Sequence, residues 1–427
     1  MATNASGTSD PTARVSDPIQ APSWSAVWAL TLCVATLIAS EFMPVSLLTP
    51  IATDLHMTEG RAGQAIAVSG FFAVVTSLMI SSATRGIDRR RVLLWLVALM
   101  MASGVMVAMA NSVVVFMAGR ALLGIVIGGF WSMSAATVMR LVPERDVPRA
   151  LGLLNGGNAL AATISAPLGS FLGQYVGWRG AFFAVVPLAV LTLCWLIATL
   201  PSLPSTRAYA AGSVFRVLRR SQVRTGMLSM ALLFLGQFAL FTYLRPFLET
   251  VTGLDIPALS LVLLITGGAG LIGTWLIGIA LRTQLYSVLI AMPLAMAAIA
   301  LALTVLGGVP FATGALLAGW GLIGTAAPVG WWTWLSKVLP DDSEAGGGLM
   351  VAVIQLAIAT GATIGGVLYD WDGYRSTFAF SAAALVGSAV CAALAWRTSR
   401  RATHAMPGEQ HAMNDAIEAA SQTHPAH

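Results

Sequence analysis

Two ionisable residues lie inside long apolar segments of the sequence. Glu41 falls within Trp28–Leu48, the first such segment, and Arg120 falls within the fourth. Placing a charged side chain in hydrocarbon costs free energy, so ionisable residues at membrane depth mark ion pathways, proton relays or ligand sites. A carboxylate at that depth can take up and release a proton. The pair therefore makes proton-coupled transport the first hypothesis to test.

The two residues are predicted to lie at similar depths. Glu41 is about 14 residues from the start of its segment, or ~21 Å, and Arg120 is about seven residues from the other boundary, or ~10 Å. In a hydrocarbon core about 30 Å thick these depths nearly coincide. We expect the pair to serve proton coupling, because arginine favours the ionised carboxylate and desolvation favours the protonated one. Pro44 is expected to interrupt the backbone hydrogen bonds of this helix and so loosen the segment around Glu41. A structural salt bridge with no transport role is the alternative.

The composition requires a surface that faces lipid. The chain is 57% hydrophobic and 10% charged, whereas soluble domains average about 25% charged residues. Its apolar runs are continuous and near the roughly 20 residues that a spanning helix needs, unlike the alternating strands of a barrel. We predict an all-α polytopic membrane protein with 12 transmembrane helices. The predicted spans are 26–48, 61–82, 92–110, 113–139, 149–173, 180–200, 225–248, 258–281, 286–307, 311–337, 346–368 and 376–397.

Most of the 23 basic residues fall on one side of the predicted membrane. Under the positive-inside rule this side is cytoplasmic, so both termini are predicted to be cytoplasmic. The sorting also explains the sequence pI of about 9.5, and no nucleic-acid partner is predicted. The predicted cytoplasmic set includes Arg85, Arg89, Arg90, Arg91, Arg140, Arg145, Arg149, Arg207, Arg216, Arg219, Arg220 and Arg224.

The chain divides into two similar halves. Residues 201–224 interrupt the apolar pattern with prolines and arginines. The predicted organisation is a disordered cytoplasmic tail 1–23, a six-helix bundle 24–200, a cytoplasmic linker 201–224, a six-helix bundle 225–398 and a cytoplasmic tail 399–427. Two short motifs repeat at an offset of about 196 residues: Leu141–Arg145 resembles Val338–Asp342, and Gly177–Phe182 resembles Gly373–Phe378.

This repeat places Asn158 and Gln355 at equivalent positions, and Arg120 opposite Leu317. Amides and indoles inside spans suit a flat, uncharged ligand that forms hydrogen bonds, because rings stack and amides bind edges. Each is also explained by contacts between helices or by exposure to lipid. The candidate substrate-binding residues are Asn155, Asn158, Gln237, Gln355, Trp131 and Trp331.

Two halves in parallel repeat, with a site between them, are typical of one large class of transporters. The sequence resembles the major facilitator superfamily. Asp88-Arg89-Arg90-Arg91 is similar to that family's motif after helix 2, although Thr84 replaces the usual glycine. The resemblance implies a gating latch formed by Asp88, Arg89 and Arg91, in which Asp88 pairs with the other half. Solvated positive charge is the alternative.

The fifth span contains Ala166-Pro167-Leu168-Gly169-Ser170, which resembles the antiporter motif of the drug-proton antiporter group. Pro167 and Gly169 are therefore candidate gating residues. Plain helix packing would also explain small residues there.

Longer stretches narrow the resemblance to the bacterial purine ribonucleoside efflux permeases. They include Glu41–Pro50, Gly128–Ser134 and Pro328–Trp331. The resemblance implies a monomer in the bacterial inner membrane that exports inosine, guanosine and analogues in exchange for protons, with no cofactor other than the proton gradient. Efflux of sugars or drugs by the same mechanism is the alternative. A membrane enzyme is disfavoured because no histidine lies within a predicted span, and no metal site is predicted.

Overall fold

The computed structural model describes residues 23–204, 218, 220–281, 284–339 and 343–422, with side chains described up to Arg400. Most of the predicted tail 1–23, most of the predicted linker 201–224 and the end of the tail 399–427 lie outside the described residues. The described part consists of helices and contains no strand.

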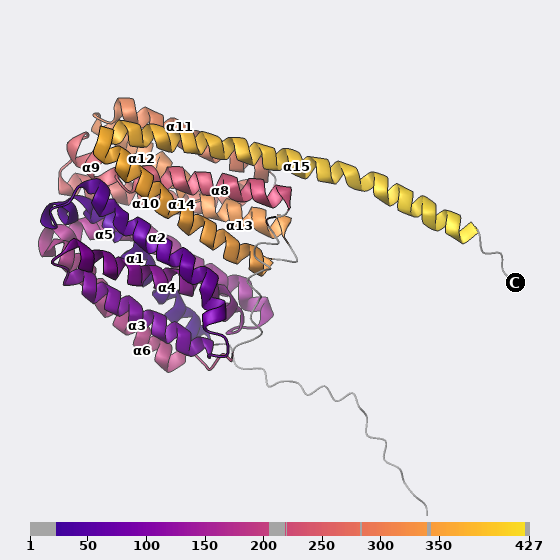
Figure 1. The fold of residues 1–427 in the computed structure, drawn as a ribbon, viewed down its shortest axis with the longest axis horizontal. Coiled ribbons are helices and arrows are strands. Elements are labelled where there is room, and N and C mark those ends of the chain that lie inside the picture. The colour runs from indigo at the N-terminus through magenta and orange to yellow at the C-terminus, as the bar shows by residue number, and fades with distance from the viewer. Residues whose placement is uncertain (1–22, 205–217, 219, 282–283, 340–342, 423–427) are drawn as a thin grey trace, which may run out of the picture.

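Helices of the first half pack side by side (Figure 1). We call α1 to α6 the first half. Its elements are α1 (Trp24–Asp54), α2 (Glu59–Ala83), α3 (Arg89–Ala108), α4 (Val113–Met139), the short η1 (Glu144–Asp146), α5 (Val147–Phe183) and α6 (Val185–Thr199).

The second half comprises α8 to α15 and lies against the first (Figure 1). Two of its predicted spans are broken helices, so that α8 continues into α9 and α12 into α13. Its elements are α8 (Ser221–Phe241), α9 (Leu244–Thr250), α10 (Ile256–Ala280), α11 (Leu285–Leu306), α12 (Pro310–Gly324), α13 (Ala327–Val338), α14 (Ser343–Asp372) and α15 (Tyr374–Gln422).

Eleven helical segments of the described chain are long and apolar enough to cross a membrane. One of them, Glu144–Thr199, is 56 residues long and contains two of the predicted spans. The chain reverses within it at Gly177, whose φ of 70° is readily adopted only by glycine. The predicted all-α fold with twelve spans in two halves is therefore confirmed, and α15 continues the last span as one helix to Gln422.

The two halves meet along two seams. Helix α2 packs against α14, and α5 packs against α10. Under the internal repeat these two pairs are equivalent, because α2 corresponds to α10 and α5 to α14. The seams therefore lie on either side of a pseudo-twofold axis, and α1 lies where both halves can reach it.

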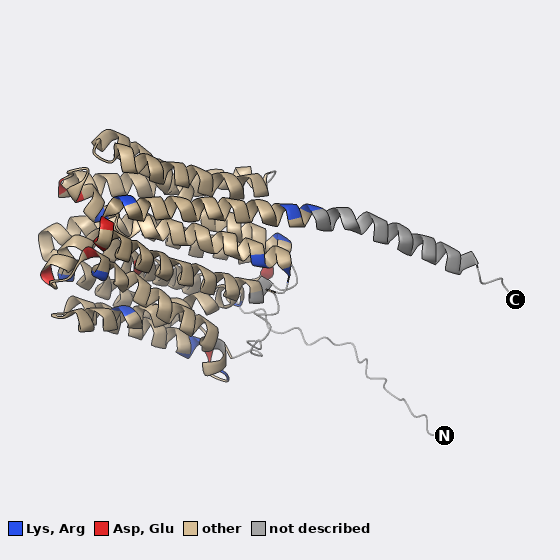
Figure 2. Cartoon of the chain, turned by 45° about the horizontal axis from the view of Figure 1, so that its top comes forward, with Lys and Arg blue, Asp and Glu red and all other residues tan. Residues whose placement is uncertain are grey.

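Charged residues concentrate at the helix ends, and the middle of the bundle is almost free of them (Figure 2). We call the end that carries Arg85, Arg89–Arg91 and Arg140 the arginine-rich end. The other, which carries Asp54, Glu59, Glu249 and Asp370, is the opposite end. This distribution has the form that the positive-inside rule gives to spanning helices, and the cytoplasmic placement of the arginine-rich end stays a prediction.

Candidate functional site

Helix α1 contains two prolines, Pro44 and Pro50, yet remains helical throughout its 31 residues. Proline has no backbone N–H, so it cannot donate to the carbonyl four residues earlier. The carbonyl oxygens of Ser40 and Ser46 therefore lack their usual helical partners. A buried carbonyl without a hydrogen-bond partner costs free energy. Each of these two carbonyls accepts a hydrogen bond from an arginine side chain instead.

Arg120 supplies the missing donor for the Ser40 carbonyl. Its side chain comes from α4 and is 1% exposed. Nη1 donates to the Ser40 carbonyl at 2.7 Å, Nη2 to the Glu41 carbonyl at 3.1 Å, and Nε to the Ala65 carbonyl at 3.3 Å. Three main-chain oxygens thus hold the guanidinium. We expected Pro44 to loosen this segment, but Arg120 fills the opening and fixes it.

Glu41 is 5% exposed and points towards the second half. Its Oε1 accepts a hydrogen bond from Nε2 of Gln355 on α14 at 3.3 Å. The sequence placed Glu41 and Arg120 together, and the structure brings Arg120 to the main chain of Glu41 rather than to its carboxylate. The carboxylate instead joins the two halves through Gln355.

An aromatic pair lies beside this bridge. The rings of Phe42 on α1 and Phe238 on α8 are stacked, with centroids 5.8 Å apart and planes at 24°. Both residues escaped the sequence analysis because a phenylalanine in an apolar span carries no signal of its own. Their position next to Glu41 and Gln237 in the chain was the available clue.

The other predicted amides are distributed unevenly. Asn158 is half-buried on α5, and Asn155 is exposed and donates to the Leu151 carbonyl of its own helix at 2.9 Å. Gln237 is half-buried on α8, and its Oε1 is buried without a hydrogen-bond partner. Of the four amides, only Gln355 is seen to bind a residue of the opposite half.

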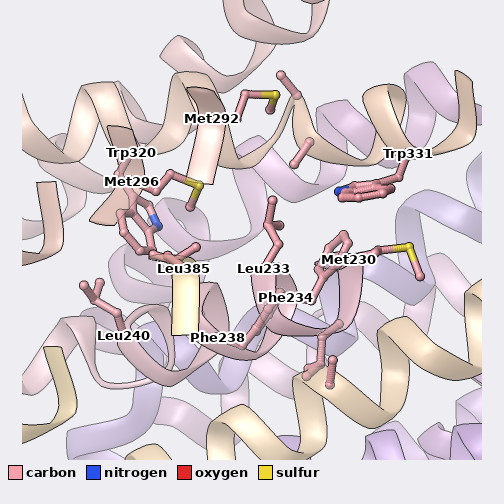
Figure 3. Close-up of a cluster of buried hydrophobic side chains, with 14 of the residues drawn as sticks. Met230, Leu233, Phe234, Phe238, Leu240, Met292, Met296, Trp320, Trp331 and Leu385 are labelled. Carbon is pink, nitrogen blue, oxygen red and sulfur yellow. The ribbon is translucent and has the colours of Figure 1, made fainter. Parts of the chain in front are cut away.

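The predicted tryptophans do not converge on the Glu41 bridge. Trp131 is half-buried and packs edge-on against Phe130 of its own helix at 6.1 Å. Trp331 is 1% exposed and belongs to the apolar core of the second half, with Met230 and Phe234 (Figure 3). The sequence did not indicate which face of the helix Trp331 occupies, and in this conformation it is a core residue.

Asp88 lies at the arginine-rich end and caps α3. Its carboxylate accepts from the backbone N–H of Arg90 at 2.8 Å, from that of Leu203 at 2.9 Å, and from the Ser202 hydroxyl. Burial opposes ionisation, but these hydrogen bonds outweigh it and hold the pKa of Asp88 below its usual value.

We expected Asp88 to reach the other half, yet these partners lie in its own half and at the start of the linker. The backbone N–H of Arg89 donates to the Leu203 carbonyl at 3.0 Å, which adds to the same attachment. Arg91 is exposed at the start of α3. In this conformation the motif fastens the linker to the first half.

The two gating candidates of α5 face different partners. A Cβ at Gly169 would lie 2.6 Å from the Ser46 hydroxyl, so this glycine lets α5 approach α1. Pro167 removes the helical partner of the Thr163 carbonyl. That carbonyl faces Gly267 of α10, where a Cβ would lie 2.6 Å from it. The proline and glycine therefore shape contacts on both sides of α5.

Further hydrogen bonds join the halves towards the opposite end. Asp370 on α14 accepts from the Thr58 hydroxyl at 2.6 Å and from the Gly60 N–H at 2.9 Å, at the start of α2. Thr363 donates to Gln64 Oε1 at 3.1 Å. The sequence analysis missed the Asp370 contacts because polar residues at helix ends look like ordinary loop residues. These bonds join the two halves near the opposite end.

The sequence matches the family described as Major Facilitator Superfamily over residues 30–347. A relative from Pseudomonas aeruginosa, named transcription regulatory protein OpdE, is 57% identical over 386 residues, 90% of this chain and 96% of the relative. The purine ribonucleoside efflux pump NepI of Escherichia coli strain K12 is 44% identical over 368 residues, 86% of this chain and 93% of the pump.

Solved transporters share the fold. A D-xylose-proton symporter superposes with a TM-score of 0.70 at 17% identity, covering 86% of this chain and 97% of the symporter. A bacterial homologue of the lysosomal transporter Spinster, in an inward-facing and unoccupied conformation, gives a TM-score of 0.65 at 14% identity, with coverages of 88% and 96%. The sequence match, the twelve spans and the shared fold agree, and the chain belongs to the major facilitator superfamily.

Proposed function

We propose that this transporter exports purine ribonucleosides such as inosine and guanosine in exchange for protons, by alternating access. The substrate class is supported by the relatives named purine ribonucleoside efflux pumps, at 43–44% identity. The observation that carries the mechanism is the Glu41–Gln355 hydrogen bond, because it places a titratable group on the contact between the two halves.

Glu41 is the proposed proton carrier. A proton that arrives from outside binds its carboxylate, and the same proton leaves to the cytoplasm after the halves have moved. Ionised Glu41 accepts from the Gln355 amide, whereas protonation neutralises the acceptor and weakens a charge-assisted bond. Because three main-chain carbonyls hold Arg120, we expect protonation of the Glu41 carboxylate to leave these bonds in place. Arg120 therefore supplies a constant positive charge that assists release of the proton.

The substrate is proposed to bind at the same level. In this conformation the Phe42 and Phe238 rings stack on each other, and a planar base is proposed to take up this stacking contact when the halves separate. Gln237 Oε1, which is unpartnered, is a free acceptor for a base N–H or a ribose hydroxyl. Asn155 and Asn158 on α5 remain proposed contacts from the first half. Base and proton would thus compete for one interface, which couples export to proton entry.

The test is inosine uptake into everted membrane vesicles under an imposed pH gradient, with and without Glu41→Gln. We expect gradient-driven accumulation by the native chain, and a fall of at least about 100-fold in the variant, as loss of an essential proton-transfer group produces. Glu144→Gln is the control, since Glu144 is an exposed carboxylate at the arginine-rich end. Failure of the native chain to accumulate inosine would exclude the nucleoside assignment and favour sugars or drugs.

The relative named as a transcription regulatory protein gives a second hypothesis. A transporter changes gene expression when it sets the intracellular concentration of an effector. The regulatory effect would then be a consequence of export and not a separate activity. Under this hypothesis Glu41→Gln abolishes a regulatory effect of the chain together with its transport, whereas a direct regulator would keep the effect.

A further inference from the structure

Arg245 is a buried cation at the junction of the two halves. It lies on α9 and is 5% exposed. Its Nε pairs with Oε1 of Glu249 at 2.8 Å, one helical turn further on. Its Nη1 donates to the carbonyl of Ser46 on α1, in the other half. One side chain thus joins a helix of the second half to the backbone of the first.

The acceptor exists because of Pro50. Without an N–H at position 50 the Ser46 carbonyl has no helical donor. Ser46 itself is 1% exposed, so water does not readily replace the missing donor. A charged donor at a buried carbonyl forms one of the stronger kinds of protein hydrogen bond. The pair of Pro50 and Arg245 therefore makes a specific, directional contact between halves.

We propose that Arg245 is a positioning residue that clasps the second half to α1 while the opposite end is closed, with Glu249 holding the guanidinium in place. The residue pairs that close this end, Arg245 with Ser46 and Asp370 with Thr58 and Gly60, would separate together when the molecule opens there. The inference rests on the alternating access of the proposed function but not on the identity of the substrate.

The test is the distance between spin labels at the opposite end of the full chain. Thr53→Cys on α1 and Asp372→Cys on α14 give two exposed labelling sites, one in each half, once Cys33, Cys194 and Cys391 are replaced by alanine. We expect the labelled chain with native Arg245 and Pro50 to give mainly the short distance between the two labels. Arg245→Met should raise the ratio of long to short distances about tenfold or more, because a charge-assisted bond is lost.

Pro50→Ala supplies the missing N–H, which competes with Arg245 for the Ser46 carbonyl. It should raise the same ratio by roughly threefold, since a carbonyl can accept two hydrogen bonds. In an Arg245→Met background it should raise the ratio no further, because the bond on which it acts is already absent. Arg245→Lys, which keeps the donor and the charge, should restore most of the short-distance population.

Arg179→Met is the matched control. Arg179 also lies at the opposite end, but it binds Asp54 at 2.7 Å and the Ala110 carbonyl within its own half. Its loss should leave the distances unchanged. The inference is overturned if Arg245→Met and Pro50→Ala keep the native distribution, or if Arg179→Met widens it equally. If Arg245→Met does not fold, Pro50→Ala alone decides. Because no substrate is added, a failure here is separate from a failure of inosine transport.

Discussion

Helix α1 touches both halves, and the contacts on its two sides differ in kind. An arginine donates to an α1 carbonyl on each side, Arg120 from the first half and Arg245 from the second. On the first-half side, however, α5 also approaches α1 closely at Gly169, whereas the other contacts from the second half are ends of side chains, namely Gln355 and the Phe238 ring. Close backbone contacts are hard to separate, whereas side chains release by rotation. The comparison indicates that α1 stays with the first half and that the second half moves against it.

The largest effect is expected from Arg120→Met. It leaves the Ser40 carbonyl without a donor inside the first half, at about 1–3 kcal/mol for an unsatisfied group. We expect the Tm in detergent to fall by about 5 °C or more, and transport to be lost. Leu317→Met, at the repeat-equivalent buried position, is the control and should shift Tm by less than about 2 °C. If the Arg120→Met protein keeps the native Tm, the idea that Arg120 holds α1 to the first half is contradicted.

A smaller effect is expected from Gly169→Ala, which tests the same side of α1. Its Cβ would lie 2.6 Å from the Ser46 hydroxyl and 3.3 Å from Met43 Cγ, so α1 or α5 must shift. Overpacking of this kind costs about 1–3 kcal/mol. We expect a lower Tm together with slower transport. Gly156→Ala on the same helix meets no atom within 4 Å and should be neutral or slightly stabilising. Equal effects of the two changes would remove the distinction between the sides of α1.

The smallest effect is expected from Asp88→Asn, away from α1. Because hydrogen bonds hold the pKa of Asp88 below its usual value, the ionised group contributes stability above its unfolded pKa of about 4 and loses it as the pH falls through the folded value. The variant should therefore have a slightly lower Tm than the native chain at pH 7, and the difference should shrink below about pH 4. A thermal-shift series over pH measures this, with Glu144→Gln as the control. A difference that grows in acid would exclude the assigned sign.

The sequence predicted the spans, the repeat and the depth of the two buried charges, because each depends on hydrophobic length and on residue order. It also placed Asn158 and Gln355 at equivalent positions, and Gln355 does contact Glu41. These properties survive any rotation of a helix about its own axis. That is why they can be read from one chain.

Contacts that depend on rotation were not predictable. Trp331 packs into the apolar core of its own half, and Phe238, which carries no signal in the sequence, faces α1. Pro44 was expected to interrupt the helical hydrogen bonds of α1. The sequence did not show that the Arg120 side chain of α4 would supply the missing donor. The sequence analysis gave Arg245 no role, because it lies near the end of the predicted span 225–248.

The main-chain acceptors of Arg120 and Arg245 have a consequence for how this protein can vary. No replacement at Ser40 or Ser46 deletes a carbonyl oxygen, so the residue that decides whether an arginine has a partner is the proline four positions later. Arg120 is thereby linked to Pro44, and Arg245 to Pro50, although the bonds run to Ser40 and Ser46. Selection on these two bonds therefore acts on arginine and proline together, and not on the serine side chains.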